Sequence, residues 1–307
     1  MAATDNTISA EHPHTLAYAG LVLTALFWAG NAVLARGVVD VIPPVALSFW
    51  RWALALLIVL PVGIGPLRRD WPVVRRNWRR MLLVAGLSVG LFNTLLYLAA
   101  DSTTALNLTL INATMPILVA LLAWPVLGAR PRPAQAGGIA CALAGIVTIV
   151  AGGRLAALLA LSFRPGDLIM VGAVSAWALF SVLLRRRPLP MSAAGFLTAQ
   201  ILFGLPLILP AYLLELALVG GFDLTPALTL PFVYVAVFPG LLAYAFWNHG
   251  VARVGPSRAA MFIYLVPVFA AGLAFLLLGE SLAAYHAVGG ALILAGLYLA
   301  TRVPTND

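Results

Sequence analysis

The sequence predicts an all-α integral membrane protein of ten transmembrane helices, arranged as two inverted five-helix repeats with both termini in the cytoplasm. Three observations support this fold class. The chain is 63% hydrophobic and only 9% charged, whereas a soluble domain is about 45–50% apolar and roughly 25% charged. It contains ten long apolar runs, and its second half repeats features of its first half.

The repeat is visible in short matching segments. Trp28–Arg36 reads WAGNAVLAR, and 149 positions later Trp177–Arg185 reads WALFSVLLR. Four further pairs match at an offset of 151: Pro116 with Pro267, Gly128 with Gly279, Gly138 with Gly289, and Gly145 with Gly296. We therefore predict a first repeat over residues 1–153, including a polar N-terminal tail, and a second repeat over residues 154–307.

Ten segments have the length and composition of membrane-spanning helices. Such a helix needs about 20 mostly apolar residues, because each residue adds about 1.5 Å and the hydrocarbon core is about 30 Å thick. Pro, Gly and Arg separate the segments, and no gap is long enough for an extramembrane domain. The predicted spans are residues 15–35, 45–66, 81–100, 104–126, 134–153, 167–184, 193–217, 228–249, 257–278 and 283–301.

The basic residues predict the orientation of these spans. All eighteen are arginines, and fourteen lie in connectors or flanks on one side of the membrane, six of them within Arg68–Arg80. Because cytoplasmic loops collect Lys and Arg, this side is predicted to be cytoplasmic and to hold both termini. Each repeat has five spans, an odd number, so the second repeat enters the membrane from the opposite side.

Composition and motifs argue against several function classes. The net charge of +8 comes from short connectors, and no polar domain presents it to nucleic acid, so we expect no nucleic-acid partner. The single cysteine, Cys141, lies in an apolar run, and the sequence has no GxSxG, HExxH or Lys-containing phosphate loop. We therefore expect no enzyme activity, no cofactor and no metal. Residues 1–15 lack Lys and Arg, so the first apolar run is predicted to be a retained anchor.

Inverted repeats are typical of secondary transporters, whose substrate site lies at the repeat interface near the membrane midplane. One sequence folded in two orientations can exchange conformations, which gives inward-open and outward-open states of similar energy. A duplicated bundle that acts as a membrane receptor or scaffold, without moving a solute, is the alternative from another class. The lipid bilayer and a small-molecule substrate are the partners that the transporter interpretation implies.

Polar and aromatic residues inside the spans are the candidate substrate site. Asn93 and Tyr97 are four residues apart on the third span and so share a face, and Tyr244 and Asn248 have the same spacing on the eighth span. The candidate substrate-binding residues are Trp28, Asn31, Asn93, Tyr97, Asn112, Trp177, Ser181, Tyr244, Trp247, Asn248 and Tyr264. For each Asn or Ser alone, a hydrogen bond between helices is the simpler interpretation.

Proline and glycine suggest further features of the bundle. Pro116 and Pro267 occupy matching positions and are predicted to kink their helices, either to free carbonyl groups for a substrate or only for packing. Small residues line the fifth and tenth spans, notably Gly138, Gly145, Gly289 and Gly296. These faces predict close packing within the bundle, with a dimer interface as the alternative. The sequence leaves a monomer and a homodimer equally open.

Charged residues inside the spans are few. Arg51, within the segment FWRW, is predicted to extend towards the nearer membrane surface. Its repeat counterpart is Gln200, so no symmetric charged site is predicted. Since no Asp or Glu lies in the middle of a span, we predict that flux needs no proton gradient, or senses one only weakly through His249.

Three segments are informative: FWAGNAV in the first span, AYAFWNHGVARVGPSRAA at Ala243–Ala260 and YLVPVFAAGLAFLLLGESL at Tyr264–Leu282. With the two five-helix halves, they resemble the EamA repeats of the drug/metabolite transporter superfamily. The resemblance covers roughly residues 15–301. Within the superfamily the chain is most similar to the YddG-type amino-acid exporters. The first half departs from the pattern, since it has Gly128-Ala129 where a Gly-Glu pair is usual.

The resemblance implies a multi-pass protein of the cell (inner) membrane that exports small metabolites, above all amino acids, by alternating access. It implies a central cavity near Trp28, Tyr97, Trp177, Tyr244, Trp247 and Asn248. Aromatic walls with amide and hydroxyl groups suit a zwitterion with an apolar side chain. The alternative within the superfamily is an exchanger of phosphorylated or nucleotide-linked sugars. That activity requires basic residues in the cavity, for which Arg51 and Arg258 are the candidates.

Overall fold

A computed structural model describes residues 12–38, 41–223, 225–279 and 281–302. All regular secondary structure among these residues is helical. The helices of the first half are α1 (His12–Val38), α2 (Pro44–Arg76), α3 (Trp78–Ala85), η1 (Gly86–Phe92), α4 (Asn93–Ser102), α5 (Ala105–Asn112), α6 (Met115–Leu127) and α7 (Pro133–Val150). Those of the second half are α8 (Leu155–Leu159), α9 (Pro165–Arg186), α10 (Ala193–Val219), α11 (Pro226–Ala236), η2 (Val237–Leu242), α12 (Ala243–Val254), α13 (Pro256–Met261), η3 (Phe262–Tyr264), α14 (Leu265–Leu278) and α15 (Ala284–Arg302).

Ten helical segments of the described chain are long and apolar enough to cross a membrane, as the sequence predicts. Four of them consist of consecutive elements, namely α3–η1–α4, α5–α6, α11–η2–α12 and α13–η3–α14. A helical architecture follows from the solvent, because hydrocarbon offers the backbone no hydrogen-bond partners and each span must satisfy its own. The chain is therefore a multi-pass membrane protein.

Helix α2 is longer than predicted. The expected span ends at residue 66, but the helix continues through Pro66 and Pro72 to Arg76. Its 33 residues correspond to about 50 Å, which exceeds a hydrocarbon thickness of about 30 Å. The arginine-rich turns at its end therefore extend beyond the apolar layer, where a proline costs little because water can satisfy the carbonyl that it leaves free.

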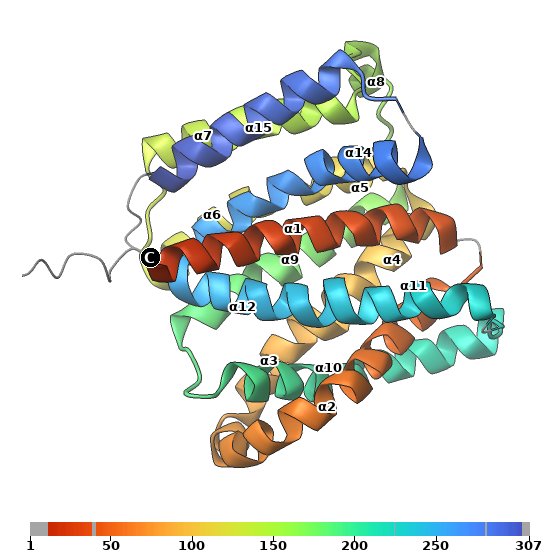
Figure 1. The fold of residues 1–307 in the computed structure, drawn as a ribbon, viewed down its shortest axis with the longest axis vertical. Helices are drawn as coiled ribbons and strands as arrows, with labels where there is room; N and C mark the ends of the chain where they lie inside the picture. The colour runs from red at the N-terminus through yellow and green to blue at the C-terminus, as the bar shows by residue number, and fades with distance from the viewer. Residues whose placement is uncertain (1–11, 39–40, 224, 280, 303–307) are drawn as a thin grey trace, which may run out of the picture.

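Corresponding helices of the two halves pack against each other in antiparallel pairs. Helices α7 and α15 lie side by side at one edge of the bundle (Figure 1). Gly138 faces Gly296 and Gly145 faces Gly289, so residue numbers rise along one helix as they fall along the other. A Cβ atom on Gly138 would lie 2.6 Å from the carbonyl oxygen of Gly296, and one on Gly145 would lie 2.5 Å from that of Gly289. The small faces therefore serve packing within the chain.

Helices α2 and α10 form the second antiparallel pair, at the other edge of the bundle (Figure 1). The carboxylate of Glu215, near the end of α10, accepts hydrogen bonds from the backbone N–H groups of Val45 (2.9 Å) and Ala46 (2.6 Å) at the start of α2. Asp70, near the end of α2, accepts from the N–H (2.9 Å) and hydroxyl (2.7 Å) of Ser192 at the start of α10. Each helix thus neutralises the positive N-terminal end of its partner.

These pairs show that the two halves have inverted topology, since corresponding helices run in opposite directions. Helix α1 begins and α15 ends at the same end of the bundle (Figure 1), which we call the terminal end. Between the two edge pairs lies the core, where α1, α4, α9 and α12 bring their buried side chains together.

Candidate functional site

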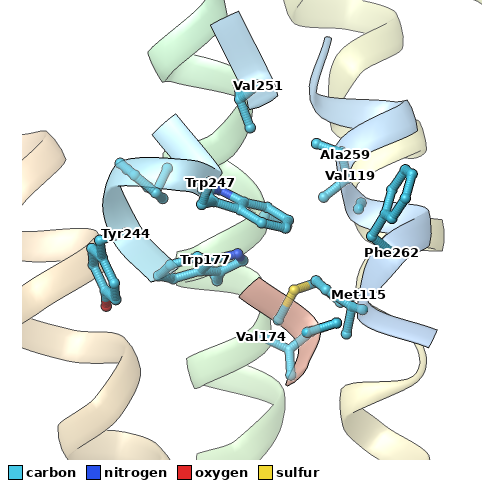
Figure 2. Close-up of a cluster of buried hydrophobic side chains, with 14 of the residues drawn as sticks. Met115, Val119, Val174, Trp177, Tyr244, Trp247, Val251, Ala259 and Phe262 are labelled. Atoms are coloured by element: carbon cyan, nitrogen blue, oxygen red, sulfur yellow. The ribbon is translucent and has the colours of Figure 1, made fainter. Parts of the chain in front are cut away.

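Aromatic rings from three helices meet in the core. The ring centroid of Trp177 on α9 lies 5.3 Å from that of Trp28 on α1, 5.4 Å from that of Trp247 on α12 and 5.2 Å from that of Tyr244. Figure 2 shows Trp247 above Trp177, with the Met115 side chain to the lower right. We call Trp28, Trp177, Tyr244 and Trp247 the aromatic cluster. The four rings pack against one another at the place where the family resemblance implies a central cavity.

A π-helical segment lies at the same place in both halves, and both segments border the aromatic cluster. Segment η1 precedes α4, and η2 precedes α12, 151 residues later. The wider turn of a π segment interrupts the regular helical hydrogen bonds and is often found at functional sites. Such a turn leaves carbonyl groups that can accept hydrogen bonds from side chains.

Corresponding carbonyl groups of the two π segments accept side-chain donors from the opposite half. The carbonyl oxygen of Ser88 accepts from the Tyr244 hydroxyl (3.0 Å). The carbonyl oxygen of Pro239, which corresponds to Ser88 at the offset of 151, accepts from Nε1 of Trp28 (3.3 Å) and from Nη2 of Arg51 (3.1 Å). These bonds tie each half to the π segment of the other.

Arg51 does not extend to the membrane surface, and that prediction was wrong. Its side chain is 0% exposed and donates from Nη1 to Asn93 Oδ1 (3.0 Å) and to the Tyr97 hydroxyl (2.9 Å). The guanidinium carbon lies 5.1 Å from the ring centroid of Trp52. The sequence could not show that acceptors from α4 and η2 converge at one depth, which lowers the cost of burying the charge.

Hydrogen bonds continue from Arg51 across the interface between the halves. Asn93 donates from Nδ2 to the Tyr244 hydroxyl (2.8 Å), and these two residues are 151 positions apart. The Tyr244 hydroxyl donates to the backbone of Ser88, whose own hydroxyl accepts from Gln200 Nε2 (2.7 Å). Gln200 Oε1 accepts from Nδ2 of Asn248 (2.9 Å). The buried polar chain consists of Tyr97, Arg51, Asn93, Tyr244, Ser88, Gln200 and Asn248.

The buried polar chain follows the symmetry of the repeat. Its corresponding residues are Arg51 and Gln200, Tyr97 and Asn248, and Asn93 and Tyr244. Arg51 bonds Tyr97 on one side, Gln200 bonds Asn248 on the other, and the contact between Asn93 and Tyr244 joins corresponding positions at the centre. The two sides differ in charge, since an arginine on one side corresponds to a neutral amide on the other.

The remaining candidates lie outside this chain. The Ser181 hydroxyl donates to the carbonyl of Trp177 on its own helix (2.9 Å), as membrane serines commonly do. Asn31 is buried on α1. Asn112 Oδ1 and the Tyr264 hydroxyl are buried without a hydrogen-bond partner among the described residues.

Breaks in two spans lie at the two predicted proline positions. Helix α5 ends at Asn112 and α6 begins at Met115, with Pro116 as its second residue. In the second half the 3-10 segment η3 separates α13 from α14, and Pro267 is the third residue of α14. A proline in the first turn of a helix sacrifices no hydrogen bond. Asn112 and Tyr264 lie at these breaks, as the last residues of α5 and η3.

Sequence reasoning did not predict the roles of Ser88 and Gln200. Ser88 lies between two glycines in an apolar segment, and only the π turn directs its carbonyl towards Tyr244. Gln200 did carry a signal, because it is the repeat counterpart of Arg51 in an otherwise apolar span. Among the described residues, no group of three or more His, Cys, Asp or Glu side chains is placed to hold a metal ion.

Two surface hollows lie away from the aromatic cluster and the buried polar chain. One is lined by Arg80, Leu83, Val84, Leu183, Arg186 and Arg187, and the other by Ile64, Leu67, Arg68, Trp71 and Leu202. Neither shares a residue with the candidate site.

Comparison with known proteins gives matches over nearly the whole chain. The family model described as "EamA-like transporter family" matches residues 15–151 and 164–302. A "Probable terminal-alkyne amino-acid exporter" of Streptantibioticus cattleyicolor is 30% identical, with 92% of each chain covered. A "Probable amino-acid metabolite efflux pump" of Salmonella typhimurium is 26% identical, with 91% of this chain and 92% of that protein covered.

A solved structure described as "Crystal structure of protein" has the same fold. The TM-score is 0.75 at 21% sequence identity, and the match covers 95% of this chain and 97% of that one. At this identity the likeness concerns the architecture alone.

Proposed function

The chain belongs to the EamA-like transporter family, and we propose that it exports amino acids, including aromatic and apolar ones, across the cell (inner) membrane by alternating access. Its two moving units are the repeats 1–153 and 154–307. The observation that carries the proposal is the contact between the aromatic cluster and the buried polar chain at the repeat interface. An amino acid needs both, since it has an apolar side chain and two polar groups.

The proposed site divides the substrate between these two surfaces. Trp28, Trp177 and Trp247 pack the substrate side chain, because flat aromatic rings bury a large apolar area. The pairs Asn93/Tyr97 and Tyr244/Asn248 exchange hydrogen bonds within the protein for hydrogen bonds to the substrate. Asn31, Asn112 and Tyr264 complete the lining when the helices separate. Ser181 is left out, because its hydroxyl is bonded to its own helix.

Symmetry supports an alternating-access cycle. Arg51 and Gln200 hold the two sides of the buried polar chain, and the bond between Asn93 and Tyr244 lies between corresponding positions. Opening on one side of the membrane breaks the hydrogen bonds of the buried polar chain on that side, while the other side stays closed. Because the two halves are repeats, opening on the other side has a similar energy. The names of the two relatives above, an amino-acid exporter and an amino-acid metabolite efflux pump, support the substrate class.

The described carboxylates support transport without proton coupling. Asp70 and Glu215 bond helix starts, and Asp167 bonds Thr103, Asn107 and the backbone of Arg164 at the start of α9. All three thus serve as helix-end partners rather than as exchangeable mid-membrane acids. We expect the substrate's own gradient to drive its flux.

Purified protein in liposomes tests the proposal. A panel of labelled amino acids, with and without an imposed pH difference, should show saturable counterflow of apolar and aromatic members that the pH difference leaves unchanged. Accumulation driven by the pH difference would contradict transport without proton coupling. Loss of that accumulation in His249→Gln would assign the coupling to His249. Flux of sugar phosphates in place of amino acids would make the protein an exchanger of that class. Absence of any flux would favour a receptor or scaffold.

A further inference from the structure

Arg51 is a buried cation whose described hydrogen bonds all go to neutral oxygens. Its acceptors are the amide of Asn93, the hydroxyl of Tyr97 and the carbonyl of Pro239. Its Nε is buried and has no hydrogen-bond partner among the described residues. Neutral acceptors reduce the cost of burying a charge but do not cancel it. An anion that could reach this guanidinium would therefore be bound strongly.

The described carboxylates of the chain are engaged or exposed elsewhere. Asp70 and Glu215 bond the starts of α10 and α2, and Asp167 bonds the start of α9. Asp101 and Asp223 are exposed. None of the described carboxylates therefore pairs with the positive charge of Arg51.

The free donor lies on the edge of the guanidinium that suits a carboxylate. Nε and Nη2 form a planar edge that can hold both oxygens of a carboxylate at once. Nη2 bonds the Pro239 carbonyl of η2. Gly240, the next residue of η2, lies against the same edge, and a Cβ atom there would be 3.8 Å from Nε. A shift of η2 would therefore expose both donors together.

This edge faces the proposed site. Trp28 and Arg51 donate to the same Pro239 oxygen, so the guanidinium and the indole are neighbours. Through Asn93, Arg51 is also linked to Tyr244, whose ring contacts Trp177. A carboxylate held by Arg51 would place the rest of an amino acid beside the tryptophan rings.

Within the buried polar chain, Arg51 is charged and its repeat counterpart is not. Gln200, at the corresponding position, has its Nε2 bonded to Ser88 and its Oε1 bonded to Asn248. It is neutral and its amide is satisfied. The carboxylate end of a substrate would consequently be bound on the Arg51 side in both open states.

We propose that Arg51 binds the carboxylate of the substrate through Nε and Nη2, replacing the Pro239 carbonyl, and thereby restricts transport to carboxylate-bearing solutes. This inference rests on the proposed function, because it assigns one end of the transported amino acid. An amino-acid amide has nearly the same shape but lacks the negative charge, so it should bind poorly.

Ligand-induced thermal stabilisation of the purified protein in detergent tests the inference without requiring transport. L-phenylalanine and L-phenylalaninamide are titrated against the wild type, Arg51→Lys, Arg51→Gln and the matched control Thr148→Val. Thr148 bonds its own helix through the Ala144 carbonyl, away from the site. The wild type and Thr148→Val should prefer the acid over the amide by about 10- to 100-fold. Arg51→Gln should bind the two alike. Arg51→Lys should keep a reduced preference, because it retains the charge but not the planar edge.

The ratio of the two affinities distinguishes loss of carboxylate recognition from a folding defect. A folding defect weakens the binding of both ligands equally. An unchanged ratio in Arg51→Gln would overturn the inference, as would a wild type that binds acid and amide equally. If Arg51→Gln does not fold, Arg51→Lys decides: a reduced ratio supports the inference, and an unchanged ratio overturns it. Failure of the proposed function has a different signature, namely that the wild type neither binds nor transports any amino acid of the panel.

Discussion

Among single residues, three tryptophans combine full burial with unused hydrogen-bond donors. Nε1 of Trp52, Trp177 and Trp247 is buried without a partner among the described residues. Leaving such a donor unsatisfied costs about 1–3 kcal/mol, and most buried polar groups in proteins avoid this cost. Two of these indoles belong to the aromatic cluster. Under the proposed function, the carboxylate or carbonyl oxygens of a bound solute would accept hydrogen bonds from these two indoles.

Tyr244 is the residue whose removal should be most informative. Its hydroxyl accepts from Asn93 and donates to the carbonyl of Ser88, so Tyr244→Phe leaves two buried groups unsatisfied at the repeat interface. Asn248→Ala removes the last member of the same chain. Each loss corresponds to about 1–3 kcal/mol, and we expect counterflow in liposomes to fall about 5- to 150-fold.

Thr148→Val, a change on the edge helix α7, is the control and should transport normally. The amount of folded protein, measured by size-exclusion chromatography, should stay at the wild-type level in all three variants. Normal transport in Tyr244→Phe and Asn248→Ala would mean that these side chains only join helices. Loss of folded protein in both would lead to the same conclusion.

Among the helices, the pairing of α7 with α15 depends on glycines that permit close approach. A Cβ atom on Gly138 would lie 2.6 Å from the Gly296 carbonyl and 2.8 Å from Ala300 Cβ. The neighbouring Gly137 faces away from α15, and a Cβ atom there would meet nothing within 4 Å. The two residues have the same chemistry and differ only in the face of the helix that they occupy.

Gly138→Ala should therefore lower the melting temperature of the detergent-solubilised protein, because the helices must separate to admit a methyl group, at a cost of about 1–3 kcal/mol. Gly137→Ala should leave it unchanged or raise it, since alanine favours the helix. Equal melting temperatures for the two variants would contradict the packing of α7 against α15. Dissociation of a dimer by Gly138→Ala, without loss of stability, would point to an interface between two chains.

For the whole molecule, inverted topology and the distribution of arginine predict which end faces the cytoplasm. Helix α9 runs from Pro165, at the end of the bundle near α8, towards the terminal end, where Arg186 and Arg187 lie (Figure 1). The positive-inside rule predicts that the terminal end is cytoplasmic, so the segment before α9 should face outwards.

Cysteine labelling tests this orientation. In a Cys141→Ser background, Ser162→Cys should react with an impermeant thiol reagent on intact cells, because Ser162 is exposed in the connector before α9. Arg187→Cys, exposed at the opposite end of the same helix, should react only after the cells are opened. The reverse pattern would place both termini outside the cytoplasm.

The architecture could be predicted from the sequence alone. Ten apolar runs and two matching halves were sufficient, because hydrocarbon allows only helices whose backbone is satisfied internally, and an odd number of spans per repeat imposes inversion. The sequence also indicated the glycine faces of α7 and α15 and the aromatic and amide residues of the core. Each of these is a property of one segment or of a simple offset between two segments.

The hydrogen-bond partners of the polar residues, in contrast, depend on the tertiary packing. Arg51 was expected at the membrane surface and instead lies among Asn93, Tyr97 and Pro239. Its position depends on two helices and a π turn meeting at one depth. Hydropathy and periodicity describe each helix separately, whereas the cost of burying a charge depends on which acceptors other helices bring to it. The buried polar chain therefore exists only where the two halves pack together.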